Sequence, residues 1–467
     1  MLYNSFQFLL VFLPLCLLFY FAAAKISGGF ANVVLAAMSL LFYAWWNPWN
    51  LLVIAISVVA NFGLGLVLRS NTTKFKKGLL ALGVAANLAA LALFKYTNFA
   101  LVNWAAVTGR HFQPLQIVLP LGISFFTFTQ IAFLVDASNG KATELGFFRY
   151  LLFVAFFPHL IAGPIVHHSE LMPQFAQPGA KKWIPANIHI GIAFLTIGLF
   201  NKVIIADNCA PWANEVFDSA YPVSCLDAWR GALAYTLQLY FDFSGYCDMA
   251  IGLAMLFNIR LPDNFNNPYQ SESIVDFWRR WHMTLSRFLR DYLYIPLGGN
   301  RKGETRREFN VMVTMLLGGI WHGAGWTYAI WGLFHGTMLI VNHAWSLLSF
   351  PLPKIFARVL TFLMVMIGWV MFRASSLHVA ASRLRSMFGL QTGQVITRPK
   401  VAGAQFMVLA ILLFLVNFTP NAKQWIESRT LNKKRAIFLG VLFFICLLQM
   451  CGTYVSHTPQ PFIYFQF

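Results

Sequence analysis

Two histidines lie in one uncharged and aromatic-rich stretch, GGIWHGAGWTYAIWGLFHG, which runs from Gly318 to Gly336. An imidazole exchanges protons near neutral pH, so His322 and His335 are both candidates for a general base that removes a proton from a hydroxyl group. On an unbroken helix their spacing is a rotation of about 220°, which places them on different faces. The alternative for each residue is a neutral histidine that packs against, or hydrogen-bonds to, a neighbouring helix.

The depth of His322 in a membrane favours the catalytic interpretation for this residue. If the basic segment 301–307 is cytoplasmic and a helix enters the bilayer near Phe309, His322 lies roughly 20 Å deep. That position is past the middle of a hydrocarbon core about 30 Å thick, where an ionisable side chain is a candidate for function. Four glycines that flank it permit close backbone approach or a break in the helix: Gly318, Gly319, Gly323 and Gly325. For His335 we expect packing.

A second group of polar residues interrupts the apolar run 231–259. Its members are Asp242, Ser244, Tyr246 and Asp248. Because carboxylates are costly in lipid, we expect these side chains to face the interior of the protein. The two carboxylates could orient a histidine, bind an ion or pair with an arginine.

Arginines mark a third segment, 273–303. Ser273 followed by Asp276 is typical of a helix start, and we expect one amphipathic helix with aromatic residues on one arc. The opposite arc carries Arg279, Arg280, Arg287 and Arg290, and His282 lies at the border. Such a helix either lies on the membrane surface against lipid phosphates or holds the phosphates of a coenzyme A thioester, since the guanidinium fork binds phosphate through two hydrogen bonds.

The composition determines which elements position these residues. The chain has 467 residues, of which 58% are hydrophobic and 11% are charged. Soluble domains carry about 25% charged residues. Long stretches contain no Asp, Glu, Lys or Arg: 1–24, 26–68, 309–353 and 436–467. A helix needs about 20 apolar residues to cross a bilayer, so the sequence predicts an all-α polytopic membrane protein.

Basic residues between the apolar runs predict the orientation. The net charge is +18, and clusters of basic residues at 69–77, 279–307 and 423–435 are typical of cytoplasmic loops next to anionic lipid rather than of nucleic-acid binding. Three spans precede the first cluster, with Asn47–Asn50 as a turn between the second and third, so we expect the N-terminus outside.

The number of crossings between the first two clusters predicts an irregular element. Five apolar runs, at 78–94, 114–135, 148–166, 187–205 and 231–259, cannot return the chain to the same side. One run must be re-entrant, or the short piece 99–107 must take part. We expect a single domain, residues 1–467, with about 10 to 13 spans plus re-entrant or interfacial helices. The six cysteines have no metal-ligand spacing, and phosphate-binding glycine loops are absent.

Several motifs together resemble the membrane-bound O-acyltransferase family, specifically its bacterial polysaccharide branch, nearly from end to end. They are MLYNSFQFLLVFLPL, LLFYAWWNPWNLL, LPLGISFFTFTQIAFLVD, FPHLIAGPIV, LQLYFDFSGYCDMAIGLA, NFNNPYQSESIVDFWRRWHMTLSRFLRDYLYIPLGGNR, LLGGIWHGAGWTYAIWGLFHG and PFIYFQF. The resemblance implies a multi-helix bundle around a central funnel and acyl transfer from a cytoplasmic thioester to an acceptor across the membrane.

The resemblance also assigns roles to residues. The catalytic histidine of the family corresponds to His322 and its second polar site to His282. His322 would act as general base or align the acceptor hydroxyl, and His282 would bind or polarise the donor. The family resemblance further implies acetyl-CoA or a similar thioester as the donor substrate, no tightly bound cofactor, and a separate extracytoplasmic partner that delivers the acetyl group to the polymer.

Together these observations predict a multi-pass acetyltransferase of the bacterial inner membrane that serves a secreted polysaccharide, of the alginate or cellulose type. Three alternatives stay open. The chain could be the membrane subunit for O-acetylation of peptidoglycan, a non-catalytic transporter of acyl groups, or a structural scaffold for polymer secretion.

Overall fold

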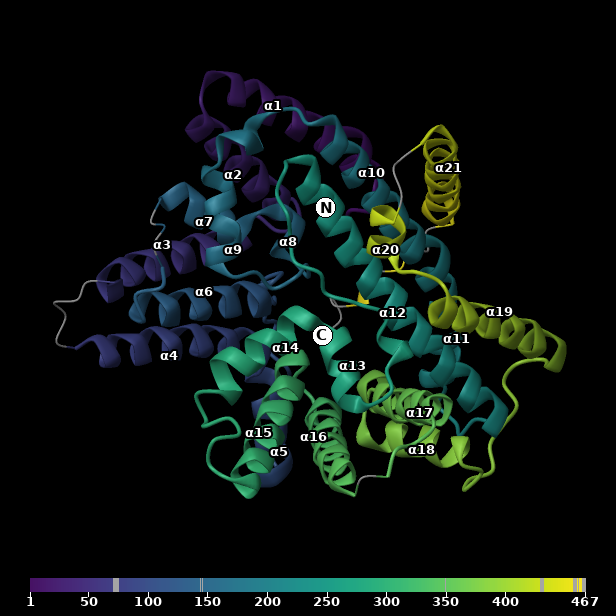
Figure 1. Ribbon diagram of the computed structural model, residues 1–467. Coiled ribbons are helices and arrows are strands. Elements are labelled where there is room, and N and C mark those ends of the chain that lie inside the picture. Colours follow the sequence, from purple (N-terminus) through teal and green to yellow (C-terminus); the bar gives the residue numbers. More distant parts are fainter. Residues whose placement is uncertain are drawn as a thin grey trace. The chain divides into compact units, whose positions relative to one another are not determined.

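The computed structural model consists of helices joined by turns and loops (Figure 1). It describes residues 1–467 except 70–74, 143, 145, 349, 429–431, 457–459, 461 and 464–467. Among the described residues, the only extended pairing is an isolated bridge between Val223 and Gln394. The predicted all-α membrane protein is therefore confirmed.

Two compact units make up the chain. The first contains Met1–Thr196 and Cys247–Pro262, and the second contains Ile197–Tyr246 and Asp263–Phe467. The long helix α12, Cys225–Leu256, contributes to both units, so neither is a continuous stretch of sequence. The single domain that the sequence predicts stays a prediction.

Helices of the first unit begin at the N-terminus. They are η1 (Gln7–Phe12), α1 (Leu13–Ile26), α2 (Gly28–Ala44), α3 (Asn50–Arg69), α4 (Lys76–Lys95), α5 (Thr97–Thr108), α6 (Ile123–Ser138), α7 (Phe147–Ala155), α8 (Phe157–Leu160), α9 (His168–Ala176), η2 (Pro178–Lys181) and α10 (Pro185–Phe200), the end of which belongs to the second unit.

The second unit holds the remaining helices. They are η3 (Asn201–Ala206), α11 (Asp207–Phe217), α12, η4 (Pro268–Gln270), α13 (Ile274–Arg280), α14 (Met283–Leu289), η5 (Arg290–Tyr294), α15 (Glu304–His322), α16 (Trp326–Leu347), α17 (Lys354–Arg373), α18 (Leu377–Met387), α19 (Pro399–Phe418), α20 (Ala422–Glu427) and α21 (Lys433–Val455).

Seven helices among the described residues are long and apolar enough to cross a membrane. They are Gln7–Ile26, Asn50–Arg69, Lys76–Lys95, Pro185–Phe217, Lys354–Arg373, Pro399–Phe418 and Lys433–Val455. The predicted 10 to 13 spans exceed this count because that range also includes runs that fold as shorter or more polar helices. For example, α2 has 17 residues and α6 has 16, whereas α12 has 32 residues but carries buried polar side chains.

The apolar run 148–166 is not one helix. It folds as α7, of nine residues, and α8, of four, with a break at Phe156 directly before the Phe157–Pro158 pair. Nine residues rise about 14 Å, less than half of a hydrocarbon core of about 30 Å. The break is buried, which is the condition under which irregular backbone is tolerated at membrane depth. The odd number of apolar runs predicted one re-entrant element. A short, broken and buried segment of this kind has the properties expected of it.

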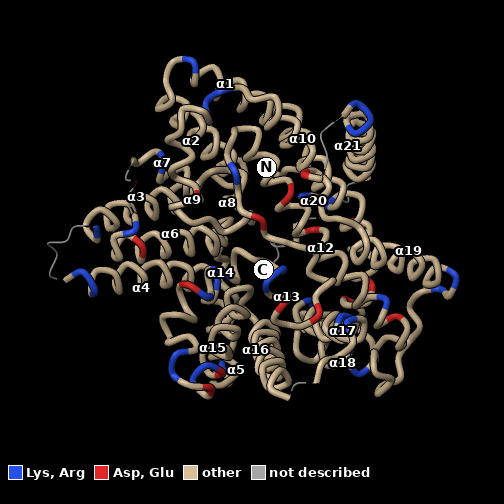
Figure 2. Tube along the Cα trace, viewed as in Figure 1, with Lys and Arg blue, Asp and Glu red and all other residues tan. Residues whose placement is uncertain are grey.

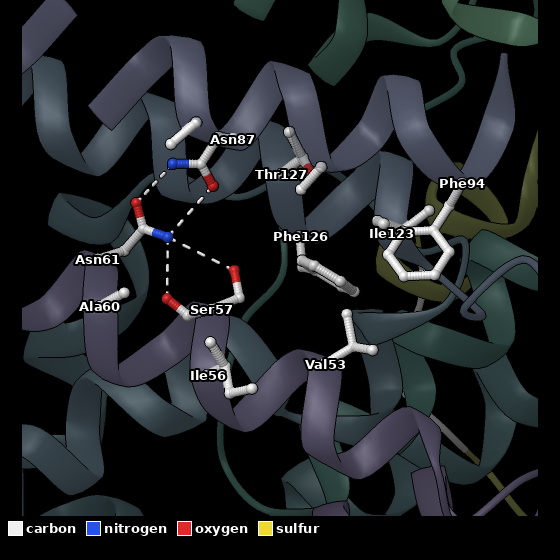
Figure 3. Close-up of a pocket in the computed structure, with 12 residues that line it drawn as sticks. Val53, Ile56, Ser57, Ala60, Asn61, Asn87, Phe94, Ile123, Phe126 and Thr127 are labelled. Carbon is white, nitrogen blue, oxygen red and sulfur yellow. Dashed lines mark hydrogen bonds between the residues drawn. The ribbon is translucent and has the colours of Figure 1, made fainter. Parts of the chain in front are cut away.

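Amide side chains join three neighbouring helices of the first unit, α3, α4 and α6 (Figure 1). Asn61 and Asn87 exchange two hydrogen bonds of 3.1 and 2.7 Å, and Gln130 donates to Ser57 Oγ at 2.8 Å. Figure 3 shows the asparagine pair at the wall of a largely apolar groove of about 320 Å³. Reciprocal bonds satisfy these amides without water, as lipid-embedded helices require.

Lysine and arginine lie mainly at helix ends and in loops (Figure 2). The segments 301–306 and 433–434 are exposed, and Lys423 Nζ lies 2.6 Å from Asp263 Oδ2. This distribution agrees with the basic loops from which the orientation was inferred.

Candidate active site

The predicted amphipathic helix begins where the sequence indicates but is broken in the middle. Ser273 Oγ accepts a hydrogen bond from the backbone N–H of Asp276 at 3.1 Å, which confirms the cap. The helix then ends at Arg280, and a new helix begins at Met283. The projection of four arginines onto one continuous helix face was therefore wrong.

His282 occupies the break with a left-handed backbone, at φ 44° and ψ 52°. This conformation costs a residue other than glycine roughly 1–3 kcal/mol unless its surroundings hold it in place. Two backbone hydrogen bonds from the preceding loop do so. Asn266 N–H donates to Arg280 O at 2.9 Å, and Met283 N–H donates to Asn264 O at 3.0 Å.

The side chain of Asn264 also fixes the His282 ring. Its Oδ1 lies 3.1 Å from His282 Nδ1 and accepts hydrogen bonds from the N–H and the hydroxyl of Thr284 at 3.2 and 2.9 Å. Because this oxygen only accepts, Nδ1 carries the proton, and Nε2 keeps the lone pair in the neutral ring. His282 is fully buried.

His322 is the last residue of α15, and it is also buried. The hairpin of α15 and α16 is closely packed, since a Cβ on Gly319 would come within 2.3 Å of Tyr328 O and 3.0 Å of Gly332 Cα. The expected role of glycine as a close-approach residue is confirmed at this position. Three aromatic rings surround the imidazole: Trp321 at 4.9 Å, Trp331 at 5.2 Å and Phe372 at 5.2 Å between ring centroids.

The fold brings the two candidate histidines together. The ring centroids of His282 and His322 lie 6.4 Å apart with an interplanar angle of 57°. One comes from a helix break and the other from a helix end, both in the second unit. At this separation, two imidazoles can act on one small reacting group placed between or beside them.

His335 lies in a different environment. It is fully buried, and neither ring nitrogen forms a hydrogen bond within the described residues. Its ring stacks on Phe277 at 6.3 Å and contacts Trp278 at 5.3 Å and Trp331 at 4.8 Å. This aromatic cage agrees with the packing interpretation for His335.

Asp242 pairs with a lysine. The sequence had suggested instead that it orients a histidine, binds an ion or pairs with an arginine. Its Oδ2 lies 2.9 Å from Lys202 Nζ, and the same nitrogen lies 2.8 Å from Asp207 Oδ1. Lys202 and Asp207 are five residues apart in the sequence. Their side chains meet because η3 is a π-helix, in which the N–H of Asp207 bonds to the carbonyl of Lys202. An analysis at α-helical spacing pairs residues three or four apart and misses this contact.

The other polar residues of α12 have separate surroundings. Ser244 and Tyr246 are buried, and the Tyr246 ring stacks on Phe462 at 4.4 Å. Asp248 is half-buried and falls in the first unit. Phe243 connects α12 to the histidine pair, because its ring meets His282 edge-on at 4.8 Å.

The four arginines are not equivalent. Arg280 pairs with Asp276 at 2.9 Å, and Arg290 pairs with its neighbour Asp291 at 2.7 Å. Arg279 is exposed and Arg287 is half-buried. A donor site made by all four therefore stays a prediction. Within the described residues, no group of three or more His, Cys, Asp or Glu side chains could hold a metal ion.

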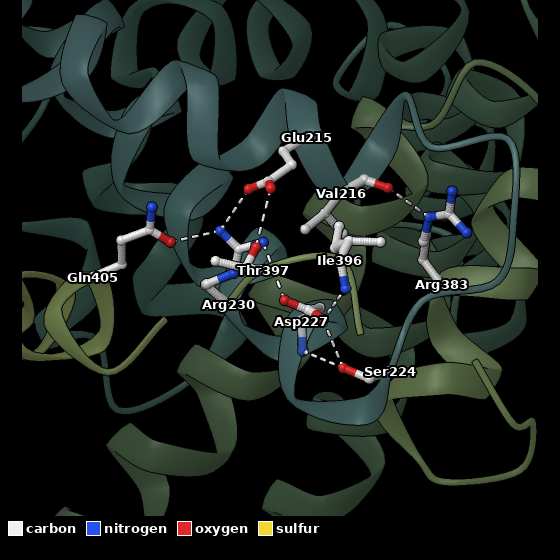
Figure 4. A network of polar contacts seen from close by, with 9 residues as sticks. All are labelled: Glu215, Val216, Ser224, Asp227, Arg230, Arg383, Ile396, Thr397 and Gln405. Atoms are coloured by element: carbon white, nitrogen blue, oxygen red, sulfur yellow. Dashed lines mark hydrogen bonds and ion pairs between the residues drawn. The ribbon is translucent and has the colours of Figure 1, made fainter. Parts of the chain in front are cut away.

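Sequence reasoning also missed a second buried cation in the same unit. Arg230 is fully buried between Glu215, at 2.9 Å, and Asp227, at 3.2 Å, and it donates to Gln405 Oε1 at 2.6 Å. Figure 4 shows this network joining α11, α12 and α19 to the loop that contains Ile396. Asp227 is a local partner, three residues before Arg230 on α12, but Gln405 and Ile396 join the network from more than 160 positions away, and no local pattern predicts those contacts.

The chain is similar in sequence to proteins of a known family. A model of the membrane-bound O-acyltransferase family matches residues 72–379, a range that includes both candidate histidines. The peptidoglycan O-acetyltransferase of Helicobacter pylori is 45% identical over 84% of this chain and 80% of its own. The probable alginate O-acetylase AlgI of Pseudomonas putida is 39% identical over the full length of both chains. The teichoic acid D-alanyltransferase of Bacillus subtilis is 30% identical over 57% of this chain and 72% of its own. The chain therefore belongs to the membrane-bound O-acyltransferase family.

Proposed function

We propose that this multi-pass membrane O-acyltransferase moves an acetyl group from a cytoplasmic thioester, such as acetyl-CoA, across the bacterial inner membrane for O-acetylation of a secreted polysaccharide of the alginate or cellulose type. The full-length similarity to a probable alginate O-acetylase supports the acetyl group and the polysaccharide acceptor.

The observation that carries the proposal is the pair His282–His322, with ring centroids 6.4 Å apart in a buried part of the second unit. His322 acts as general base and removes the proton from the acceptor hydroxyl. The hydroxyl oxygen forms a bond to the thioester carbonyl carbon, and the carbon–sulfur bond breaks. The thiolate then takes up a proton, so that ester and thiol are the products.

His282 acts on the donor in this scheme. Asn264 holds its Nδ1, so the opposite edge of the ring is the one that meets substrate. A fixed imidazole in a water-poor site needs little reorganisation during the reaction, which is the condition under which hydrogen bonds to a developing charge contribute most.

Basic residues near the break supply the donor site. Arg279 is exposed, whereas Arg280 and Arg290 each pair with a carboxylate, so Arg279 is the better candidate for the phosphates of the donor. On the other side of the membrane, a separate extracytoplasmic protein delivers the acetyl group to the polymer.

A second acceptor is supported by a specific observation. The Helicobacter pylori relative at 45% identity is named for O-acetylation of peptidoglycan. We therefore keep peptidoglycan as the alternative acceptor, served by the same histidine pair.

The test is to delete the gene and measure the O-acetyl content of each purified cell-envelope polymer by mass spectrometry. We expect one polymer to lose its acetyl groups, to regain them with the wild-type gene, and to stay unacetylated with H322A at equal membrane abundance. Full acetylation with H322A would contradict the catalytic role and would favour a transporter.

A further inference from the structure

One buried ionic cluster is not used by the proposed acyl transfer. Lys202 Nζ lies 2.8 Å from Asp207 Oδ1 and 2.9 Å from Asp242 Oδ2. The side chains of Lys202 and Asp242 are 3% and 2% exposed, and that of Asp207 is 12% exposed. Lys202 and Asp207 belong to a helical segment, Pro185–Phe217, that is long and apolar enough to span the membrane.

The charges of this cluster do not balance. With all three groups ionised, one lysine faces two carboxylates, and one negative charge remains. An uncompensated charge in a low-dielectric interior is costly, so such a group either neutralises or acquires a further partner.

Among the described residues, Lys202 is the one cation recorded against the two carboxylates. On the side of the C-terminal segment, the Phe462 ring lies 6.0 Å from Lys202 Nζ. Tyr235 lies two turns before Asp242 on α12, and the charge of Asp242 acts electrostatically on its titratable hydroxyl group. The nearby cation on α17, Arg373, pairs with Asp218 at 3.0 Å.

A comparison within the same unit shows how such a cluster is neutralised elsewhere. Arg230 also faces two carboxylates, Glu215 and Asp227, but the Glu215 side chain is 40% exposed. Its carboxylate therefore reaches the protein surface. The Lys202 cluster lacks an exposed carboxylate of this kind.

We propose that Lys202, Asp207 and Asp242 form an intramembrane proton-binding site, in which the two carboxyl groups share one proton. The step is the uptake of a proton by one carboxylate, which leaves the cluster neutral. A metal cation is the less suitable occupant, because hard cations require about six oxygen ligands and the lysine ammonium already contacts both carboxylates. This inference goes beyond the proposed function and does not depend on it.

Infrared spectroscopy of the full-length protein in lipid vesicles tests the proposal, because a protonated carboxyl group has a carbonyl absorption that carboxylates lack. We expect this band in the wild-type protein at neutral pH and its loss at alkaline pH. D207N and D242N should each lose the band at neutral pH. In each variant the one remaining carboxylate and the lysine ammonium balance in charge, so no proton needs to bind. E215Q is the matched control beside Arg230, and it should keep the band.

Three results would overturn the proposal. The first is the absence of a protonated carboxyl band in the wild-type protein at neutral pH. The second is a band that persists at neutral pH in D207N or in D242N, so that a folded sample of either variant is sufficient for this comparison. The third is a band that appears only after sodium is replaced by choline, because that result would identify a sodium ion as the occupant.

Discussion

His322 and His335 belong to one sequence motif and to two helices that pack against each other, yet their surroundings differ. Trp331 contacts both rings, at 5.2 and 4.8 Å. Beyond it, His322 faces a second imidazole, whereas His335 faces aromatic rings and forms no hydrogen bond within the described residues. A buried histidine is thus a candidate for chemistry because of the polar group that the fold brings to it, and not because of its depth or its motif alone.

The largest effect is expected for the variant H322A. If His322 is the general base, its loss should lower acyl transfer by about 100-fold or more, in the range reported for such groups. The measurement is the rate of ester formation at matched protein abundance. If H322A kept more than half of the wild-type activity, His322 would be a packing residue like His335 and not the general base.

A smaller effect is expected at Asn264, which positions His282 without touching substrate. In N264L the bond to Nδ1 is lost, and we expect the misplaced ring to stabilise the transition state by roughly 1.4 kcal/mol less. We expect a loss of about tenfold in rate, since 1.36 kcal/mol corresponds to a factor of ten.

The pH dependence distinguishes this positioning role from general loss of structure. In N264L the ring is free to change tautomer, so the pH profile of the rate should change as well as its height. An unchanged profile with a uniformly lower rate would indicate a structural role only. N61L, in the amide pair of the first unit, is the control for the general loss of a buried amide.

The smallest effect is expected for H335F. A phenyl ring is similar in size to imidazole, fits among aromatic neighbours and removes two buried polar atoms. We expect less than about a threefold change in rate and a change in unfolding free energy below about 1.5 kcal/mol. A large loss of activity in a stably folded H335F protein would show that the cage has a chemical role.

The parts that the sequence predicted well are those with local causes. The turn at Asn47–Asn50 separates α2 from α3 as expected, and Ser273 caps α13 through its own side chain. The run after Phe309 forms a helix that ends at His322, where glycine follows. Periodicity, caps and glycine positions act within a few residues, and so they can be read directly from the chain.

The parts that it missed depend on distant contacts or on irregular helices. The break at His282 is held by Asn264 and Asn266, which lie outside the helical pattern. The pairing of Lys202 with Asp207 depends on a π-helix, and the spacing of residues in the sequence does not predict a π-helix. The run 148–166 satisfies the hydropathy of a span but breaks at Phe156. In each case tertiary packing overrides the local preference.

Acyl transfer by the histidine pair can be measured directly in a reconstituted system. Purified protein in lipid vesicles is supplied with radiolabelled acetyl-CoA and the polymer identified by deletion, together with the proposed extracytoplasmic partner. The account predicts labelled ester with the wild-type protein and with H335F, and none above background with H322A. Equal labelling with H322A and H335F would contradict it.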